Sequence, residues 1–182
     1  FSMNKALFLD RDGVLNIDNH YVGHIDDFEF IPGVFDALRQ AQSEGYLLIV
    51  VTNQAGIARG YYTEADFARL TDWMKDAFLA EQVVIRQVYY CPFHVDGVVP
   101  EFTGKSEMRK PNPGMLLQAH KDHDLDLAQS IMIGDKESDV EAGKRAGVGC
   151  TVRVSQDESV NTEADKVVRS IADLPACLGW TN

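Results

Sequence analysis

The sequence alternates short apolar segments with amphipathic segments, and this alternation restricts the folds that the chain can adopt. The apolar segments have the length and composition of buried strands, and they occupy residues 6–9, 46–51, 83–90, 130–133 and 149–154. Helical patterns stand between them, as where Val34, Leu38 and Ala41 recur at the spacing of one helix face. Strands that alternate with helices predict an α/β fold with a mostly parallel sheet.

The length and composition predict one domain. The chain has 182 residues, of which 45% are apolar, an ordinary value for a globular protein. A chain of this length can bury roughly 70% of its unfolded surface. We expect a single domain over residues 3–182, because Phe1-Ser2 ahead of Met3 resembles a remnant of cloning. The 3 cysteines are odd in number and scattered, which predicts no disulfide framework.

The charge balance argues against several classes of partner. The formal net charge is -11 at pH 7, which disfavours nucleic acid or an anionic membrane as the main ligand. No apolar run approaches the roughly 20 residues of a membrane span, and no signal-peptide pattern opens the sequence. We therefore expect a cytoplasmic monomer with a small-molecule partner. A site for an anionic substrate must then concentrate its cations locally.

Two carboxylates stand where the first predicted strand ends. Asp10-Arg11-Asp12-Gly13 follows directly on residues 6–9, and Gly13 permits a sharp turn there. Two carboxylates separated by one residue point to the same side of an extended chain. Such a pair suits divalent-metal and phosphate chemistry, because one carboxylate can attack phosphorus while the other transfers a proton. An acidic surface turn is the alternative interpretation of this pattern taken alone.

Two loops carry candidate ligand contacts. The second strand runs into a glycine-containing segment that suits an anion-binding loop. Its candidate residues are Thr52, Asn53, Gln54 and Arg59. Residues 14–31 have no regular periodicity and follow the first strand, a position typical of a ligand-contacting loop. Its candidate residues are Asp18 and Tyr21. Each of these residues also suits an ordinary surface loop or a strand end.

Two further segments combine charge with a predicted helix start. Arg109-Lys110 precedes a helix for which we expect Asn112 as the N-cap and Pro113 as the first residue. Adjacent cations and free backbone N–H groups together favour phosphate binding there. Asp135 and Asp139 follow the strand at 130–133, and their spacing can place both on one helix face.

The shared placement of these groups outweighs the alternatives for each one. Asp10, Thr52 and Asp135 each follow an apolar strand directly. In parallel sheets the carboxyl ends of the strands open onto one crevice, so these side chains should lie close together. The sequence therefore predicts one phosphate- and metal-binding site rather than several unrelated polar turns.

The same groups, in this order, resemble the haloacid dehalogenase-like phosphohydrolase superfamily. Its four motifs correspond to Asp10-Arg-Asp-Gly-Val, Thr52-Asn53, Lys110, and Gly134-Asp135 through Asp139. The resemblance implies a Rossmann-like three-layer sandwich. It also implies Asp10 as nucleophile, Asp12 as general acid and base, and Thr52 and Lys110 as ligands of the phosphoryl group. Magnesium would be held by the Asp10 carboxylate, the Asp12 main-chain carbonyl and Asp135, while Asp139 would orient Lys110 or the metal shell.

A narrower resemblance covers most of the chain. It is to the D-glycero-D-manno-heptose 1,7-bisphosphate 7-phosphatases, and it rests on Asp18-Asn-His-Tyr21, Phe28-Glu-Phe-Ile-Pro-Gly33, Thr52 to Gly60, Tyr89-Tyr-Cys-Pro92, Arg109 to Met115 and Gly134-Asp-Lys136. It implies removal of the C7 phosphate, no large cap domain, and substrate contacts from Asp18, Tyr21, Asn53, Gln54, Arg59 and Arg109. The related histidinol-phosphate phosphatases share many of these segments and remain an alternative, as does another small phosphosugar phosphatase.

The sequence departs from this family at one site. Both related groups usually carry a zinc bound by Cys-x-His and Cys-x-Cys before the Arg-Lys motif. Here Cys91 is present, but Phe93, Ser106 and Met108 occupy the other positions, and His94 is one residue out of register. A four-ligand zinc site needs its full set. We expect no zinc, and a loop held instead by packing of Phe93, Phe102 and Met108.

Two other functional classes fit the sequence less well. A catalytically silent phosphate-binding module would keep the fold without turnover, and the presence of Asp10, Asp12, Lys110 and Asp135 disfavours it. A polynucleotide 3′-phosphatase is disfavoured by the net charge of -11. A magnesium-dependent phosphatase of a small phosphosugar is therefore the expected function.

Overall fold

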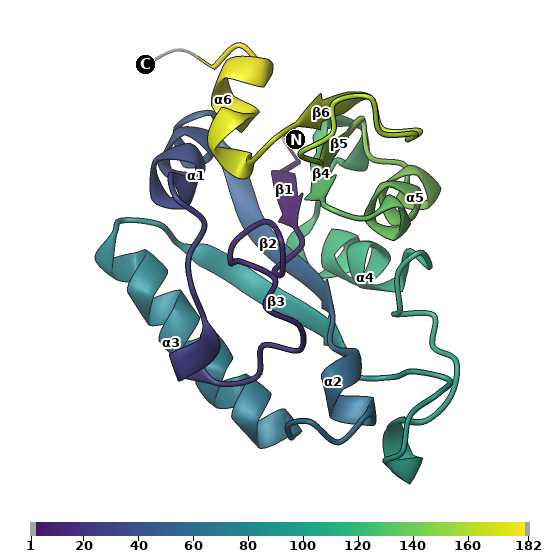
Figure 1. Cartoon of the computed structure of the whole chain (residues 1–182). Helices are drawn as coiled ribbons and strands as arrows, with labels where there is room; N and C mark the ends of the chain where they lie inside the picture. Colours follow the sequence, from purple (N-terminus) through teal and green to yellow (C-terminus); the bar gives the residue numbers. More distant parts are fainter. Residues whose placement is uncertain (1–2, 181–182) are drawn as a thin grey trace.

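Six strands form one parallel sheet in the computed structural model, which describes residues 3–180 (Figure 1). The strands are β1 (Lys5–Leu9), β2 (Tyr46–Asn53), β3 (Ile85–Cys91), β4 (Ile131–Gly134), β5 (Cys150–Val154) and β6 (Lys166–Val168). Every neighbouring pair is parallel, which confirms the predicted α/β class. The short edge strand β6 was not predicted as a strand. Residues 1–2, expected to be a cloning remnant, lie outside the described residues.

Helices cover both faces of the sheet. The α-helices are α1 (Val34–Ser43), α2 (Ala55–Ala58), α3 (Glu64–Ala80), α4 (Gly114–His123), α5 (Glu137–Ala146) and α6 (Leu174–Cys177). Short 3-10 turns are η1 (Ile25–Asp27), η2 (Pro100–Phe102), η3 (Leu127–Gln129) and η4 (Ile171–Asp173). Side chains from α1, α3 and α6 pack on one face, and side chains from α4 and α5 pack on the other. This is the predicted three-layer sandwich.

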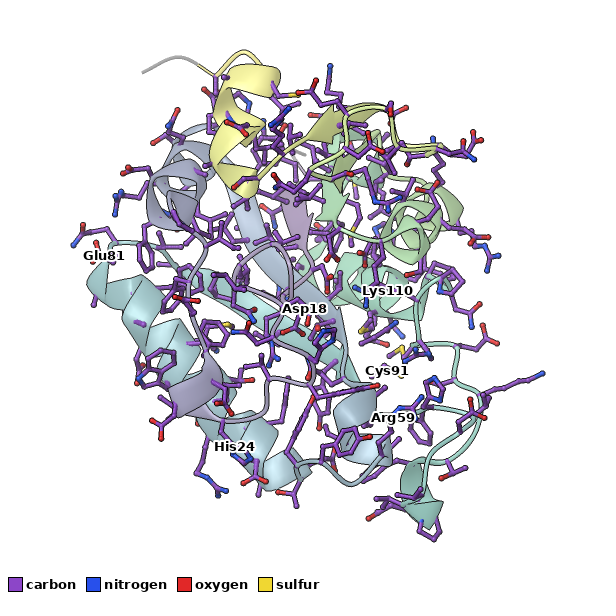
Figure 2. All side chains as sticks on the ribbon, in the orientation of Figure 1. Asp18, His24, Arg59, Glu81, Cys91 and Lys110 are labelled. Carbon is purple, nitrogen blue, oxygen red and sulfur yellow. The ribbon has the colours of Figure 1, made fainter. Side chains whose placement is uncertain are left out.

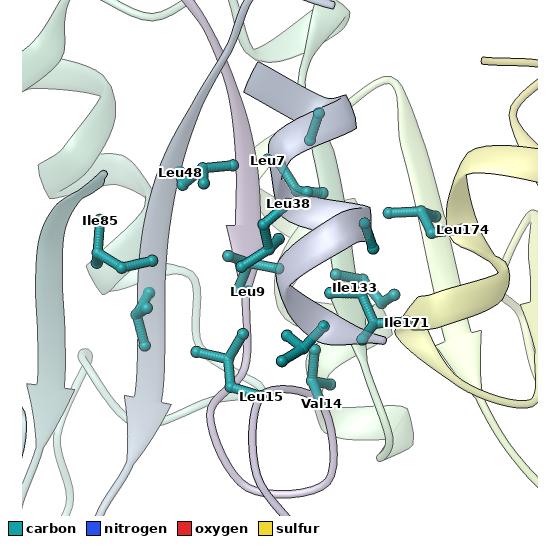
Figure 3. Packing of buried hydrophobic residues seen from close by; sticks show 14 of the residues in the cluster. Leu7, Leu9, Val14, Leu15, Leu38, Leu48, Ile85, Ile133, Ile171 and Leu174 are labelled. Atoms are coloured by element: carbon teal, nitrogen blue, oxygen red, sulfur yellow. The ribbon is translucent and has the colours of Figure 1, made fainter. Parts of the chain in front are cut away.

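Alternation of side chains along β1 supplies the core on both faces. Leu7 and Leu9 pack under Leu38 of α1, beside residues of β2, β3 and β4 (Figure 3). Ala6 and Phe8 point the opposite way and belong to the cluster that contains the buried residues of α4. Because both faces are covered, an almost continuous apolar strand is the stable choice here.

The strand order brings the predicted site residues together. The order of the strands across the sheet is β3-β2-β1-β4-β5-β6. From β1 the chain adds β2 and β3 toward one edge of the sheet, and from β4 it adds β5 and β6 toward the other edge. A crevice forms at the carboxyl ends of the strands where the order reverses, which here is between β1 and β4. Asp10 follows β1, Asp135 follows β4, and Thr52 and Asn53 close β2 on the other side of β1.

The cap predicted for the helix after Lys110 is wrong, whereas α3 begins with a regular cap. Thr63 caps α3 through a reciprocal pair of hydrogen bonds with Asp66. However, α4 begins at Gly114, with Pro113 at the N-cap position. The side chain of Asn112 instead donates to the Ser106 carbonyl at 3.0 Å and accepts from Arg145 at 3.2 Å, so these two contacts hold it away from the helix end.

None of the helices described between residues 3 and 180 combines the length and the apolar composition that a membrane span requires.

Candidate active site

A buried lysine ammonium joins the ends of two strands to the start of a helix. Lys110 Nζ donates to Asp10 Oδ1 at 3.0 Å, to Asp139 Oδ1 at 2.6 Å and to the Val51 carbonyl at 2.8 Å. Only 3% of Lys110 is exposed. An ammonium has three N–H donors, so its hydrogen-bonding capacity is filled by these three partners. The contacts hold the segment before α4 against the ends of β1, β2 and the start of α5.

The backbone of Lys110 is fixed as firmly as its side chain. Asn53 Nδ2 donates to the Lys110 carbonyl at 3.1 Å, and the Lys110 N–H donates to Asn53 Oδ1 at 3.0 Å. The side-chain amide of Asn53 thus pairs with both backbone polar groups of Lys110, as the backbone of a neighbouring strand would. Asn53, predicted as a substrate ligand, thus also anchors the loop that supplies the lysine.

Three carboxylates meet beside this lysine. Each of Asp10, Asp135 and Asp139 has an oxygen within 4.8 Å of an oxygen of the other two. Burial, and then the charge of Asp139, raises the pKa of Asp135 to about 6. The same two causes raise the pKa of Asp10 well above its usual value, although Lys110 opposes them. Burial alone would lower the pKa of Lys110, but the ion pairs with Asp10 and Asp139 outweigh it and raise that pKa.

Asp135 lies just ahead of α5 rather than on it, which corrects the predicted helix register. Helix α5 begins at Glu137 with Lys136 as its N-cap, and Asp139 Oδ2 accepts from the Lys136 N–H at 3.1 Å. Arg153 Nε donates to the Asp135 carbonyl at 2.9 Å and fixes this turn. The two carboxylates therefore meet because the turn directs Asp135 toward Asp139, and not because they share a helix face.

Gly13 is the residue that lets the two acidic turns approach. Its φ of +88° lies in the left-handed region, and a Cβ at this position would stand 2.1 Å from Asp135 Oδ2. A side chain here would therefore strain the backbone and collide with a carboxylate. The Asp10–Asp12 turn and Asp135 can share one site only because residue 13 is glycine.

The residues present fit a hard divalent cation. Asp135 Oδ1 is buried and has no hydrogen-bond partner within residues 3–180. The cluster sets three carboxylates against one buried ammonium, with only the exposed Lys136 among the described residues acting on Asp135 besides. A divalent cation would therefore balance it, and carboxylate and carbonyl oxygens are the ligands that magnesium prefers. Both oxygens of Asp139 already accept hydrogen bonds, from Lys110 and from the Lys136 N–H. Asp10 and Asp135 are therefore better placed to bind the ion, with the Asp12 main chain in the adjoining turn.

Asp12 is held in a different environment from Asp10. Its Oδ1 accepts from Arg11 Nη2 at 2.9 Å and from Asn16 Nδ2 at 2.9 Å. Its Oδ2 accepts from Gln54 Nε2 at 3.1 Å. Arg11 is 1% exposed and also donates to the Val22 carbonyl at 2.5 Å, which ties residues 10–16 to the loop that follows. This structural use of an arginine could not be predicted from the sequence, because its partners are set by the fold of the 14–31 loop.

A pocket of about 480 Å³ opens beside these groups and contains all six predicted substrate contacts. Asp18, Arg59 and Lys110, which border it, come from three separate segments (Figure 2). The predicted contacts on its wall are Asp18, Tyr21, Asn53, Gln54, Arg59 and Arg109. The wall also holds five polar side chains for which the sequence predicted no substrate contact, namely His20, Tyr62, His94, Lys136 and Ser138. Lys136 and Ser138 could have been found from their place directly after a strand.

A smaller cavity of about 40 Å³ adjoins the pocket and reaches Asp10, the nucleophile candidate. It is lined by Asp10, Asp12, Asn53, Lys110, Lys136, Ser138 and Asp139, most of which also line the pocket. Thr52, expected to bind the phosphoryl group, lines neither space. Its side chain is fully buried, and its hydroxyl accepts from Gln54 Nε2 at 3.0 Å.

Two arginines and a histidine gather on one wall of the pocket. Arg59, His94 and Arg109 all line it, and Arg59 Nε is buried without a hydrogen-bond partner within residues 3–180. Burial, followed by the charges of Arg109 and Arg59, lowers the pKa of His94. Burial also lowers the pKa of Arg109, and the charge of Arg59 adds to that effect. An anion on this wall would relieve the mutual repulsion of the two arginines.

Packing holds the loop at 91–109 at the pocket rim. Phe93 and Phe102 meet edge to face with their ring centroids 5.9 Å apart, and Phe93 and Met108 pack on the buried cluster that contains Cys91. His94 Nδ1 accepts from the Asp96 N–H at 2.9 Å. The packing expected of Phe93, Phe102 and Met108 is thus present.

The charge imbalance predicts how Asp135 affects stability. Since the folded-state pKa of Asp135 is raised to about 6, its ionisation destabilises the folded protein as the pH rises through that value. Asp135→Asn should therefore stabilise the cation-free protein at neutral pH by on the order of 1–2 kcal/mol. The same change should abolish the stabilisation that magnesium gives to the unsubstituted protein.

Urea unfolding with chelator and with saturating magnesium chloride measures both effects, and Asp36→Asn on the exposed face of α1 is the matched control. An Asp135→Asn variant that magnesium stabilises as strongly as the control would contradict this assignment.

Comparisons with known proteins agree with this geometry. A HAD-hydrolase-like family model matches residues 107–174. A D-glycero-alpha-D-manno-heptose-1,7-bisphosphate 7-phosphatase of Burkholderia mallei is 51% identical over 94% of this chain and 92% of its own length. A D-glycero-beta-D-manno-heptose-1,7-bisphosphate 7-phosphatase of Haemophilus influenzae is 50% identical over 97% of both chains.

A solved structure extends the comparison to the fold. It is the D,D-heptose 1,7-bisphosphate phosphatase of B. bronchiseptica in complex with magnesium and phosphate, with a TM-score of 0.82 and 28% identity over 96% of this chain and 97% of that one. The resemblance seen in the sequence is thereby confirmed. Because relatives about half identical match nearly the whole chain, this protein belongs to the D-glycero-D-manno-heptose-1,7-bisphosphate 7-phosphatase family and is a phosphoric monoester hydrolase of the HAD-like fold.

Proposed function

We propose that this enzyme removes the C7 phosphate of D-glycero-D-manno-heptose 1,7-bisphosphate through an aspartyl-phosphate on Asp10, with magnesium as its cofactor. The observation that carries the proposal is the juxtaposition of two spaces. A narrow cavity reaches Asp10 and Lys110, and the wide pocket beside it bears two arginines. One phosphate can enter the cavity while a second lies on the arginine wall. The names of the relatives at 51% and 50% identity support this substrate.

The first chemical step places a bond between Asp10 and phosphorus. The Asp10 carboxylate attacks the C7 phosphate, the bond from phosphorus to the sugar oxygen breaks, and Asp12 gives its proton to that oxygen. Lys110, 3.0 Å from Asp10 Oδ1, offsets negative charge beside the transferring group. The backbone N–H of Arg11 donates to Asp10 Oδ1 as well, at 2.9 Å, and helps to fix the plane of the carboxylate.

The second step returns the enzyme to its starting state. Asp12, now a carboxylate, removes a proton from water, which attacks phosphorus and breaks the bond to Asp10. Magnesium, when bound by Asp10, Asp135 and the Asp12 main chain, supplies positive charge that reduces repulsion between the carboxylate and the phosphate. Asp139 positions Lys110 through their 2.6 Å contact and does not itself need to touch the phosphate.

We also propose that the loop at residues 91–109 binds no zinc and that the enzyme acts in the cytoplasm. We expect no structural zinc, because Phe93, Ser106 and Met108 replace ligands of the family pattern and aromatic packing already orders the loop. The cysteines at 91, 150 and 177 are free, which is typical of the reducing cytoplasm.

Phosphate release from the two anomers of the 1,7-bisphosphate tests the proposed activity. The unsubstituted enzyme with magnesium should release one phosphate per sugar and leave the 1-phosphate. Asp10→Asn keeps the size of the side chain but removes the attacking charge, so turnover should fall by a factor on the order of 10⁴ or more.

Asp36→Asn should keep the full rate. Turnover by Asp10→Asn within tenfold of that control would show that Asp10 is not the nucleophile. Turnover of the unsubstituted enzyme on neither anomer would exclude the heptose bisphosphate as substrate.

We expect Arg109 to bind the second phosphate of the substrate, which is the one at C1. Arg109 is half-buried, and Nη1 makes one long contact with the Phe93 carbonyl at 3.4 Å, which leaves donors directed to the pocket it lines. We expect Arg109→Ala to lower kcat/KM for the 1,7-bisphosphate by about 1.5–3 kcal/mol, the scale of one charged hydrogen bond. The loss should be much smaller for the 7-phosphate that lacks the C1 group.

Measuring two substrates on two proteins separates this contact from general damage. Arg69→Ala, on the exposed face of α3, is the control and should change neither rate. Equal losses on both substrates would show that Arg109 does not bind the second phosphate, and a monophosphate such as histidinol phosphate would become the better candidate.

A further inference from the structure

Gln54 is buried between the proton-transfer candidate and a tyrosine. Only 2% of Gln54 is exposed, although it borders the pocket. Its Nε2 donates to Asp12 Oδ2 at 3.1 Å and to Thr52 Oγ1 at 3.0 Å, and its Oε1 accepts from the Tyr62 hydroxyl. Both ends of the amide are thus engaged inside the protein, so little of it remains to bind a substrate.

These partners allow one orientation of the amide. An ionised carboxylate can only accept, so the NH₂ end of Gln54 must face Asp12. The oxygen end then faces Tyr62, which must donate. Burial raises the pKa of the Tyr62 hydroxyl far above its usual range, so the hydroxyl keeps the proton that it donates.

Tyr62 is itself held in place by close packing. A Cβ added at Gly23 or at Gly56 would stand 2.3 Å from an atom of its ring, so the ring fills the space between these two backbone segments. Its other neighbours in the buried cluster are Ile57 and Phe67. The packing of Tyr62 against α2 and the loop at residues 22–23 therefore fixes its hydroxyl, and the hydroxyl in turn holds the Gln54 amide.

The two oxygens of Asp12 differ in what remains open to them. Oδ1 accepts from Arg11 Nε at 3.3 Å, from Arg11 Nη2 at 2.9 Å and from Asn16 Nδ2 at 2.9 Å. Oδ2 accepts from Gln54 alone among the described side chains. Since a carboxylate oxygen has two lone pairs, Oδ2 keeps one for a proton, whereas Oδ1 is saturated.

We propose that Gln54 and Tyr62 are positioning residues for proton transfer, which hold Asp12 so that Oδ2 delivers the proton to the leaving oxygen. This rests on the proposed role of Asp12 as general acid. It assigns Gln54 a function through Asp12, in place of the direct substrate contact expected from the sequence. The amide fixes the carboxyl plane from one side, while Arg11 and Asn16 fix it from the other.

The size of the effect follows from the contact that is lost. Tyr62→Phe removes one buried hydrogen bond and leaves the ring, so the amide of Gln54 can rotate and Asp12 loses its fixed orientation. One such bond contributes about 1–2 kcal/mol, which corresponds to about a 5- to 30-fold change in rate. The loss should appear only where the leaving group needs a proton.

A series of substituted phenyl phosphates isolates this dependence, because these substrates lack sugar contacts and differ mainly in the basicity of the leaving phenolate. For Tyr62→Phe and Gln54→Leu, kcat/KM should fall about 5- to 30-fold with the most basic phenolate, and by less than about twofold with p-nitrophenolate. The plot of log kcat/KM against leaving-group pKa should become steeper than for the unsubstituted enzyme.

Matched variants distinguish positioning from general damage. Tyr90→Phe removes a hydroxyl that donates to Glu64. The ring of Tyr90 also packs on Phe67, so this variant perturbs the same region without reaching Asp12. It should leave the slope unchanged. Asp12→Asn should give the steepest slope, and adding Tyr62→Phe to it should cause no further loss.

The outcomes separate the proposal from the function on which it rests. If Asp12→Asn steepens the slope and Tyr62→Phe lowers all rates equally, Tyr62 is merely structural and the proposal fails alone. A further loss from Tyr62→Phe in the Asp12→Asn background would overturn it as well. If Asp12→Asn leaves the slope unchanged, Asp12 is not the general acid, and both the proposed mechanism and this inference fall.

Discussion

The active site depends on one buried ammonium group. Lys110 joins the ends of β1 and β2 to the start of α5 through Asp10, Val51 and Asp139. Burying a charge is costly unless it is paired and hydrogen-bonded, and here all three donors are used. The ammonium is therefore a structural contact and a catalytic group at once. Its removal would leave a cluster of carboxylates without its buried, hydrogen-bonded counterion.

The remaining negative charge explains the use of a metal ion. Asp10, Asp135 and Asp139 lie within reach of one another, and Asp135 keeps a buried oxygen without a partner within residues 3–180. Gly13 makes this proximity sterically possible. Such a cluster is poorly balanced by Lys110 alone, and a divalent cation corrects the balance while bringing positive charge to the anionic substrate. The cations on the pocket wall then offset the overall acidity of the chain, whose net charge is -11.

Much of the site could be predicted from the sequence because a parallel sheet gathers the ends of its strands. Asp10 and Asp135 directly follow apolar runs, so their convergence follows from the α/β pattern. Contacts that depend on the conformation of a loop could not be predicted in this way. The Thr52 hydroxyl accepts a hydrogen bond from Gln54, and Asn112 is held by the Ser106 carbonyl rather than capping α4. Local propensity describes neither kind of contact.

The account is tested most directly by trapping the covalent intermediate. With substrate labelled in the C7 phosphate, rapid acid quenching during the first turnover should yield labelled protein, since acyl phosphates survive brief acid treatment. Peptide mapping should place the label on the segment that contains Asp10. Label at any other residue, or full turnover with no labelled protein on a timescale that resolves a single turnover, would contradict the central claim that Asp10 is the nucleophile.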